Sequence, residues 1–138
     1  MKNENETFTI GKLAERAGVN VETVRFYERK GLIQKPQNSI GYRKYPNSDA
    51  AKIKFIKKTQ ELGFTLKEAK ELLELRVNKA AKCSSVKNKT DLKIKEVAEK
   101  INDLQKIKNT LIKLSESCSN KDVSVTECPI IESFEEIK

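Results

Sequence analysis

Residues 9–33 read TIGKLAERAGVNVETVRFYERKGLI, a stretch that predicts two short helices joined by a tight turn. The first helix begins after Thr9, a residue type that caps helix N-termini, and Gly18 ends it where a turn needs a positive φ. Asn20 is expected to cap a second helix that runs from Val21 to Lys30. Together they predict a helix-turn-helix, whose second helix is available to the major groove of DNA.

The outer side of the second helix carries the side chains that we expect to contact DNA. Val24 is expected to pack inward, which leaves the polar positions around it to face a partner. Arg25 is the strongest candidate, because a guanidinium can bind a phosphate or a guanine edge through two hydrogen bonds. The alternative is that Arg25 and Arg29 only form ion pairs with nearby glutamates. The predicted DNA-contact residues are Asn20, Glu22, Thr23, Arg25, Tyr27, Arg29, Tyr42 and Arg43. Tyr42 and Arg43 belong to the segment that follows the second helix.

Two short strand candidates follow the second helix, Leu32-Ile33 and Tyr42 to Tyr45. The loop between them contains proline, asparagine and glycine, which are typical of turns. The pattern predicts a hairpin wing that touches the DNA backbone with Tyr42 and Arg43. The alternative is a plain connection whose tyrosines pack beneath it.

Two more helices are predicted after this wing. A third helix should run from Ser48 or Asp49 to Gly63. Thr65 and Glu68 have the spacing of a capping box, in which each side chain bonds the backbone N–H of the other, and they predict the start of a fourth helix. The residues predicted to face inward are Ile53, Phe55 or Ile56, and Leu62 on the third helix, and Ala69, Leu72 and Leu73 on the fourth.

Positive charge is concentrated in the first half of the 138-residue chain, whose net charge is +8. Residues 1–63 hold 13 Lys or Arg against 7 Asp or Glu, a balance of +6, whereas residues 64–138 hold 15 against 13, a balance of +2. A concentrated positive field is expected of a nucleic-acid-binding protein. An ordinary solvated surface is the alternative.

The composition argues against several classes of protein. No stretch reaches the roughly 18 apolar residues of a membrane span, and no signal peptide is visible, so we expect a cytoplasmic protein. The chain has no histidine, and no Gly-rich phosphate loop or carboxylate pair stands out, so we expect no catalytic residues and no enzyme. In a reducing cytoplasm, three cysteines are expected to be free thiols or metal ligands.

A long helical pattern without glycine or proline connects Cys83 to Cys118, which lie 35 residues or five heptads apart. The positions between them at heptad spacing are Thr90, Val97, Leu104 and Leu111. A helix of this length keeps the two thiols roughly 50 Å apart at about 1.5 Å per residue, so they cannot meet within one chain. They can meet if two copies pair antiparallel, which predicts a coiled-coil homodimer with thiol sites at its ends. The alternative is that the apolar stripe packs on the chain's own N-terminal domain.

These stretches together resemble the MerR family of transcription regulators. The resemblance rests on residues 9–14, 18–33, 41–45 and 55–68, about half of the chain. The cysteine pattern of the second half is similar to that of the mercury-responsive members. The resemblance implies a homodimer that represses mercury-resistance genes without metal. With Hg(II) it would activate them by twisting promoter DNA into a shape that RNA polymerase can use.

The resemblance also implies that Cys83, Cys118 and Cys128 hold one Hg(II) as effector ion, with Cys83 supplied by the second subunit. An all-sulfur donor set without histidine favours a soft ion, and three thiolates leave zinc short of its usual four ligands. Pro129 biases Cys128 toward an extended backbone, as expected of a loop that folds back. The alternative is that these thiols are small apolar residues in a helix seam.

One departure from the family pattern leaves the choice of ion open. The loop from Ser119 to Glu127 is one residue longer than expected, and relatives that respond to lead, cadmium or zinc use partly similar cysteines. A cytosolic metal buffer and a thiol-redox protein are more distant alternatives. The predicted architecture is all-α with a small β wing. It comprises a winged helix-turn-helix domain (1–76), a long antiparallel coiled-coil dimerisation helix (77–118), and a metal-binding loop with a short tail (119–138).

Overall fold

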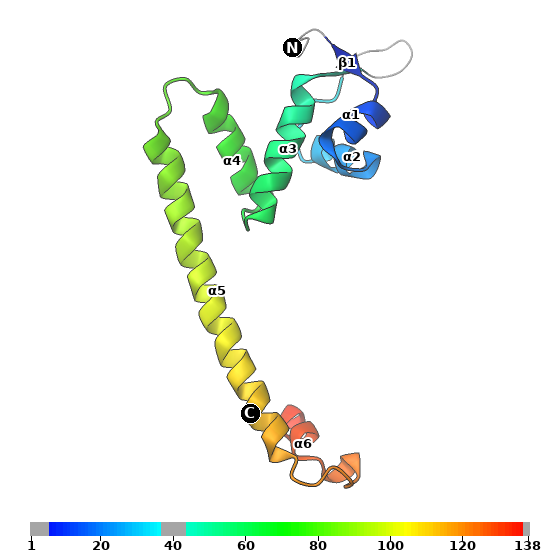
Figure 1. Cartoon of the computed structure of the whole chain (residues 1–138), viewed down its shortest axis with the longest axis vertical. Coiled ribbons are helices and arrows are strands. Elements are labelled where there is room, and N and C mark those ends of the chain that lie inside the picture. The colour runs from blue at the N-terminus through cyan, green and yellow to red at the C-terminus, as the bar shows by residue number, and fades with distance from the viewer. Residues whose placement is uncertain (1–5, 37–43, 137–138) are drawn as a thin grey trace. The chain divides into compact units, whose positions relative to one another are not determined.

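The computed structural model describes residues 6–36 and 44–136, and they are mostly helical (Figure 1). The chain divides into two compact units, residues 1–90 and 91–138. Within the described residues, no helix combines the length and the apolar character needed to cross a membrane. The helices are α1 (Ile10–Ala17), α2 (Val21–Arg29), α3 (Ser48–Glu61), α4 (Leu66–Val77), α5 (Cys83–Ser117), the short 3-10 helix η1 (Val125–Glu127) and α6 (Pro129–Glu135). The strands are β1 (Thr7–Phe8) and β2 (Tyr45–Pro46).

The helix-turn-helix forms as its capping residues predict. The Thr9 side chain accepts a hydrogen bond from the Lys12 N–H, which satisfies a donor in the first turn of α1. Gly18 ends α1 with φ 72°, a left-handed conformation that glycine adopts without steric cost. The Asn20 side chain then accepts a bond from the Thr23 N–H at 2.8 Å and so caps α2. α2 ends at Arg29, one residue earlier than predicted, and Lys30 is its C-terminal cap.

The core of the first unit lies where α1 packs against α2 and α3, and where α3 packs against α4. Leu13, Val24, Ile53 and Ile56 are fully buried there, which confirms the predicted inward positions of Val24 and Ile53 and selects Ile56 over Phe55. Leu62 was predicted to face inward, and this is wrong because it is 59% exposed. It follows the last residue of α3 and no longer keeps that helix's register.

The predicted pairing of the wing strands is wrong. β2 pairs antiparallel with β1 at the start of the chain, with Phe8 opposite Tyr45. Leu32 and Ile33 are buried and form no strand. They follow the turn that closes the C-terminus of α2, where the Leu32 N–H donates a hydrogen bond to the Tyr27 carbonyl at 2.9 Å. The predicted contacts from Tyr42 and Arg43 lie outside the described residues.

Two predicted features of the later helices are confirmed. Thr65 and Glu68 form the capping box of α4, with both reciprocal hydrogen bonds present. α5 is one continuous helix of 35 residues that starts at Cys83, while residues 78–82 form the connection from α4. Most of the large apolar side chains along α5 are exposed, among them Ile94, Val97, Ile101, Leu104 and Leu111.

Candidate nucleic-acid interface and metal centre

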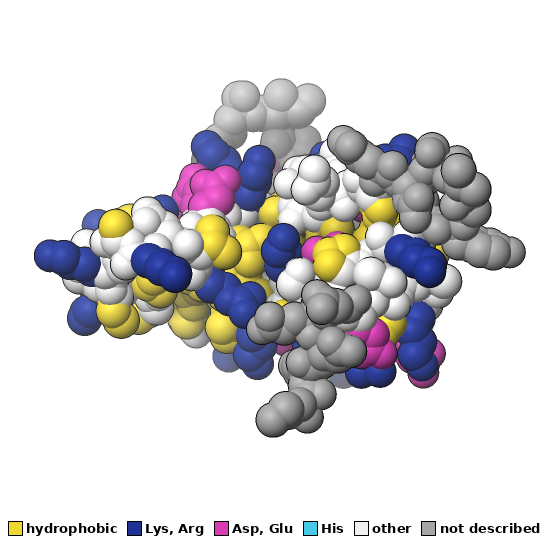
Figure 2. Space-filling view, turned by 90° about the horizontal axis from the view of Figure 1, so that it is seen from above, with side chains coloured by type: hydrophobic (Ala, Val, Ile, Leu, Met, Phe, Trp, Pro, Cys, Tyr) yellow, Lys and Arg dark blue, Asp and Glu magenta, His cyan; other side chains and the backbone are white. Residues whose placement is uncertain are grey.

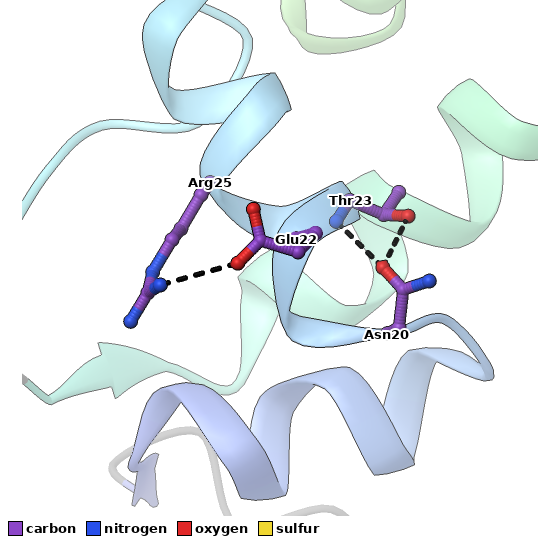
Figure 3. Close-up of polar contacts among 4 residues, drawn as sticks. All are labelled: Asn20, Glu22, Thr23 and Arg25. Atoms are coloured by element: carbon purple, nitrogen blue, oxygen red, sulfur yellow. Dashed lines mark hydrogen bonds and ion pairs between the residues drawn. The ribbon is translucent and has the colours of Figure 1, made fainter.

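The N-terminus of α2 is fixed by its own polar side chains (Figure 3). The Asn20 side-chain oxygen accepts hydrogen bonds from both the backbone N–H and the hydroxyl of Thr23, each at 2.8 Å. This oxygen is therefore committed to the cap, whereas the Asn20 amide nitrogen points away from Thr23 (Figure 3). The two residues set where α2 begins and hence which of its side chains face outward.

Arg25 lies on the exposed side of α2, where its Nη1 is 3.2 Å from Glu22 Oε1 (Figure 3). This ion pair between Arg25 and Glu22 is the one expected if Arg25 pairs with a nearby glutamate, the alternative to a DNA contact. Both side chains are more than half exposed, and an ion pair of this kind contributes at most about 1 kcal/mol. Glu22 can therefore release Arg25 to a phosphate or a base edge at little cost.

The other side chains predicted on α2 divide into exposed and buried ones. Arg29 is exposed, and its guanidinium carbon lies 5.9 Å from the centre of the Phe26 ring. Glu28 accepts a hydrogen bond from the Tyr45 hydroxyl. Tyr27 is 4% exposed, its hydroxyl donates to Gln60 Oε1 at 3.0 Å, and burial raises its pKa. Tyr27 thus joins α2 to α3 in the core, and this burial argues against the DNA contact predicted for it.

The three cysteines are free thiols that lie at the ends of helices. Cys83 is the first residue of α5 and is exposed. Cys118 follows the last residue of α5, is half-buried, and its Sγ lies 3.8 Å from the Asn120 carbonyl oxygen. Because α5 is continuous, Cys83 and Cys118 are separated by roughly 50 Å of helix at about 1.5 Å per residue. Within the described part of one chain, His, Cys, Asp and Glu form no cluster of three that could hold a metal.

Cys128 is positioned by the short segment between α5 and α6. Ser124 caps η1 through a bond from the Thr126 N–H, and the Cys128 N–H bonds the Val125 carbonyl at 3.3 Å. Cys128 has the extended backbone that Pro129 favours, with φ −79° and ψ 118°, as predicted. Its side chain is half-buried.

Comparison with known proteins assigns this arrangement to a family. The family described as MerR HTH family regulatory protein matches residues 8–75, and the one described as MerR, DNA binding matches residues 50–114. A mercuric resistance operon regulatory protein of Bacillus cereus is 47% identical over 129 residues, covering 92% of this chain and 96% of the relative. The chain belongs to the MerR family.

Solved structures of MerR-family regulators share the fold. A transcription regulator of Ralstonia metallidurans in complex with lead(II) is 33% identical, with a TM-score of 0.82, and the match covers 92% of this chain and 98% of that one. The dual function transcriptional regulator MerR of Bacillus megaterium in complex with mercury(II) is 45% identical, with a TM-score of 0.69, covering 94% and 100%. The helix-turn-helix and the long helix predicted from the sequence are thus the elements of a DNA-binding transcription regulator.

The structure of this MerR-family chain adds residues that the sequence did not single out. Phe26 is an exposed aromatic residue on α2, and the Lys30 Nζ lies 5.7 Å from its ring centre. Lys57 of α3 donates to the Gly18 carbonyl at 3.2 Å and so holds the turn between α1 and α2. The closeness of Phe26 and Lys30 in the sequence could have suggested their contact. No local signal could have suggested the bond from Lys57 to Gly18, because these residues lie 39 positions apart.

The face of the molecule seen in Figure 2 shows more Lys and Arg surface than Asp and Glu surface.

Proposed function

We propose that this chain is a mercury(II)-responsive transcriptional regulator of a mercury-resistance operon, a repressor without metal and an activator with Hg(II). The observation that carries the proposal is the placement of Cys83 and Cys118 at opposite ends of one continuous helix, in a chain 47% identical to a mercuric resistance operon regulatory protein. Two antiparallel copies of this helix would bring the thiols together.

The DNA side of the proposal rests on α2. Its exposed polar side chains, led by Arg25, would enter the major groove of one operator half-site, and two copies would read two half-sites. Arg25 is weakly held, and Arg29 supplies a second exposed cation. The proposed contact residues within the described part are Asn20, Glu22, Thr23, Arg25 and Arg29.

The dimer is supported by the exposed apolar stripe of α5. Val97, Leu104 and Leu111 share one heptad position, and an exposed stripe of this length needs a partner helix. In the antiparallel pairing, Cys118 and Cys128 of one chain approach the partner's Cys83. Three free thiols without any histidine fit a soft, thiophilic ion such as Hg(II).

The regulatory step follows from linkage between the two ends of the dimer. Hg(II) supplies strong bonds to thiolates, so the conformation that brings Cys118, Cys128 and the partner's Cys83 together is favoured when the ion is bound. The two helix-turn-helix units hold one DNA duplex, and a change in the angle between them deforms it. RNA polymerase would then use a promoter that it cannot use in the metal-free complex.

A mercury titration of the purified protein tests this proposal. We expect one Hg(II) per site of three thiols, and loss of that stoichiometry when Cys83, Cys118 or Cys128 is changed to serine. Footprinting should show that the same operator is protected with and without metal, with altered DNA distortion when Hg(II) is present. A monomer that retains Hg(II) tightly would contradict the shared site.

The second candidate is a regulator of the same family that responds to another soft or borderline ion, such as lead(II), cadmium or zinc. The fold similarity to the lead-bound regulator, with its TM-score of 0.82, favours this candidate, as does the nine-residue loop from Ser119 to Glu127. Competition between the ions for the purified protein separates the two candidates. Stoichiometric binding of another ion in preference to Hg(II) would select the second.

A further inference from the structure

Helix α6 presents an acidic and apolar surface. Ile131 and Phe134 are 41% and 65% exposed, although both are large apolar side chains. They are three residues apart and therefore lie on one side of the helix. Glu132 and Glu135 follow them at the same spacing and form an adjacent acidic row, also exposed. A helix of seven residues is not stable in water by itself; within its own unit α6 contacts η1, and its exposed apolar and acidic sides are open to a further surface.

The charge of this tail is complementary to that of a segment near Cys83. Residues 122–136 contain five Asp or Glu and no Lys or Arg. Residues 78–89, the connection from α4 and the first turns of α5, contain four lysines and no Asp or Glu. Lys89 is paired with Glu71 at 3.0 Å, whereas Lys79 and Lys82 are exposed just before the helix. The acidic residues are Asp122, Glu127, Glu132, Glu135 and Glu136, and the lysines are Lys79, Lys82, Lys87 and Lys89.

The proposed metal site would bring these two surfaces together. Cys128 directly precedes Pro129, the first residue of α6, and the partner's Cys83 directly follows the partner's Lys82. A seven-residue helix is about 10 Å long at about 1.5 Å per residue. Cysteines that share one ion therefore bring all of α6 to within roughly one helix length of the partner's basic segment. The same segment of its own chain stands at the other end of α5.

We propose that α6 of each chain docks on residues 79–89 of a second copy of this chain. Ile131 and Phe134 pack near the exposed Val86, and the acidic row of α6 faces Lys79 and Lys82. The inference rests on the proposed function, because it needs the antiparallel dimer. The second copy is the partner for two reasons: the charges are opposite, and the surface continues the proposed α5 interface.

This contact strengthens metal retention without adding a ligand. By holding α6 on the partner, it raises the effective concentration of Cys128 at the partner's Cys83. The contribution of the exposed charges falls as salt is added, because the Debye length is about 10 Å at 0.1 M and about 3 Å at 1 M. Salt should therefore weaken Hg(II) retention in the wild type more than in a chain whose tail is neutral.

Zero-length carbodiimide cross-linking of the wild-type protein tests the contact directly. It joins a carboxylate to an amine only when the two are in contact. A mixture of ¹⁵N-labelled and unlabelled chains distinguishes bonds between chains from bonds within one. We expect bonds between Glu132 or Glu135 of one chain and Lys79 or Lys82 of the other. Bonds only within one chain, or none from α6, would overturn the proposal.

A charge exchange tests what the contact does. Glu132→Lys with Glu135→Lys, and separately Lys79→Glu with Lys82→Glu, should each weaken retention of Hg(II) against a competing dithiol by roughly tenfold. The four changes combined should restore it. The control is Lys95→Glu with Lys106→Glu, the same charge change at exposed positions of α5 far from both cysteines, which should leave retention unchanged.

The outcomes separate this inference from the proposed function. If the combined variant binds no better than either half, docking by charge is wrong, although the wild type remains a dimer that binds Hg(II). If the wild type itself is monomeric or does not bind Hg(II), the proposed function fails first. Circular dichroism of each variant checks that the helices are intact, and the cross-linking result does not depend on any variant.

Discussion

The two compact units of this chain differ in how far their apolar side chains are buried. In residues 1–90, Leu13, Val24 and Ile53 are fully buried by other residues of the same unit. In residues 91–138, most large apolar side chains of α5 are exposed, with Leu104 at 64%. The first unit therefore contains the core that its fold requires, whereas the apolar surface of the second is the one that the proposed dimer would cover.

The largest effect is expected from breaking the core of the first unit. Ile53→Ala removes a fully buried side chain of α3, the helix that packs against α1 and α4, and should cost roughly 2–5 kcal/mol of unfolding free energy. The loss should not depend on protein concentration, because the core belongs to one chain. Urea unfolding followed by tyrosine fluorescence measures it. The chain has no tryptophan, and its tyrosines Tyr27, Tyr42 and Tyr45 all belong to this unit.

The matched control is Lys54, the exposed neighbour of Ile53 on the same helix. Lys54→Ala keeps helix propensity and removes no buried group, so it should change the unfolding free energy by less than about 0.5 kcal/mol. Equal losses for Ile53→Ala and Lys54→Ala would mean that the core does not stabilise this unit in the way described.

A second change tests whether the other unit depends on a partner. Leu104→Ala should weaken the dimer by about 3 kcal/mol, on the order of 100-fold in its dissociation constant, because both copies lose a covered side chain. Leu92→Ala is the matched control. Leu92 is 62% exposed in the single chain, close to Leu104, but lies outside the heptad stripe. Sedimentation equilibrium measures both, and equal effects would contradict the predicted register.

Local signals in the sequence were sufficient to predict the helices of the first unit. Thr9, Gly18, Asn20 and the Thr65 capping box act within a few residues, so their effect can be predicted without a fold. The pairing of β1 with β2 places Phe8 opposite Tyr45, far apart in the sequence, and no periodicity reports it. The burial of Tyr27 could have been predicted from the sequence, since Tyr27 lies three residues after Val24 on the same side of α2.

The candidate site was predicted in part, for similar reasons. Heptad spacing placed Cys83 and Cys118 at the ends of one helix, because a regular helix converts sequence separation into distance. The contacts that hold α2 in place, such as Lys57 on the Gly18 carbonyl and Glu28 on Tyr45, link distant segments and were not predicted. The shared thiolate site stays a prediction, since it depends on a second chain.

The smallest effect concerns a carboxylate inside the first unit. Asp49 is 3% exposed, and burial raises its pKa; Lys52, 3.8 Å away, lowers it, and Glu28 raises it further. A raised folded pKa means that the contribution of Asp49 to stability is fully present below its unfolded pKa of about 3.9 and is lost as pH rises through the folded value. Asp49→Asn should remove this loss, so its stability relative to wild type should increase with pH from about 4 upward.

Urea unfolding of both proteins by tyrosine fluorescence, at several pH values from about 4 to 7, measures the difference between their free energies. The difference isolates Asp49, because all other titrating groups are shared. Asp103→Asn, the same chemical change at an exposed position of α5, is the control and should leave the pH dependence of the first unit unchanged. Since Asp49 belongs to the self-contained core, Asp49→Asn should not alter the pH dependence of dimer dissociation. A parallel shift in that dissociation would show that the two units are less independent than their burial implies.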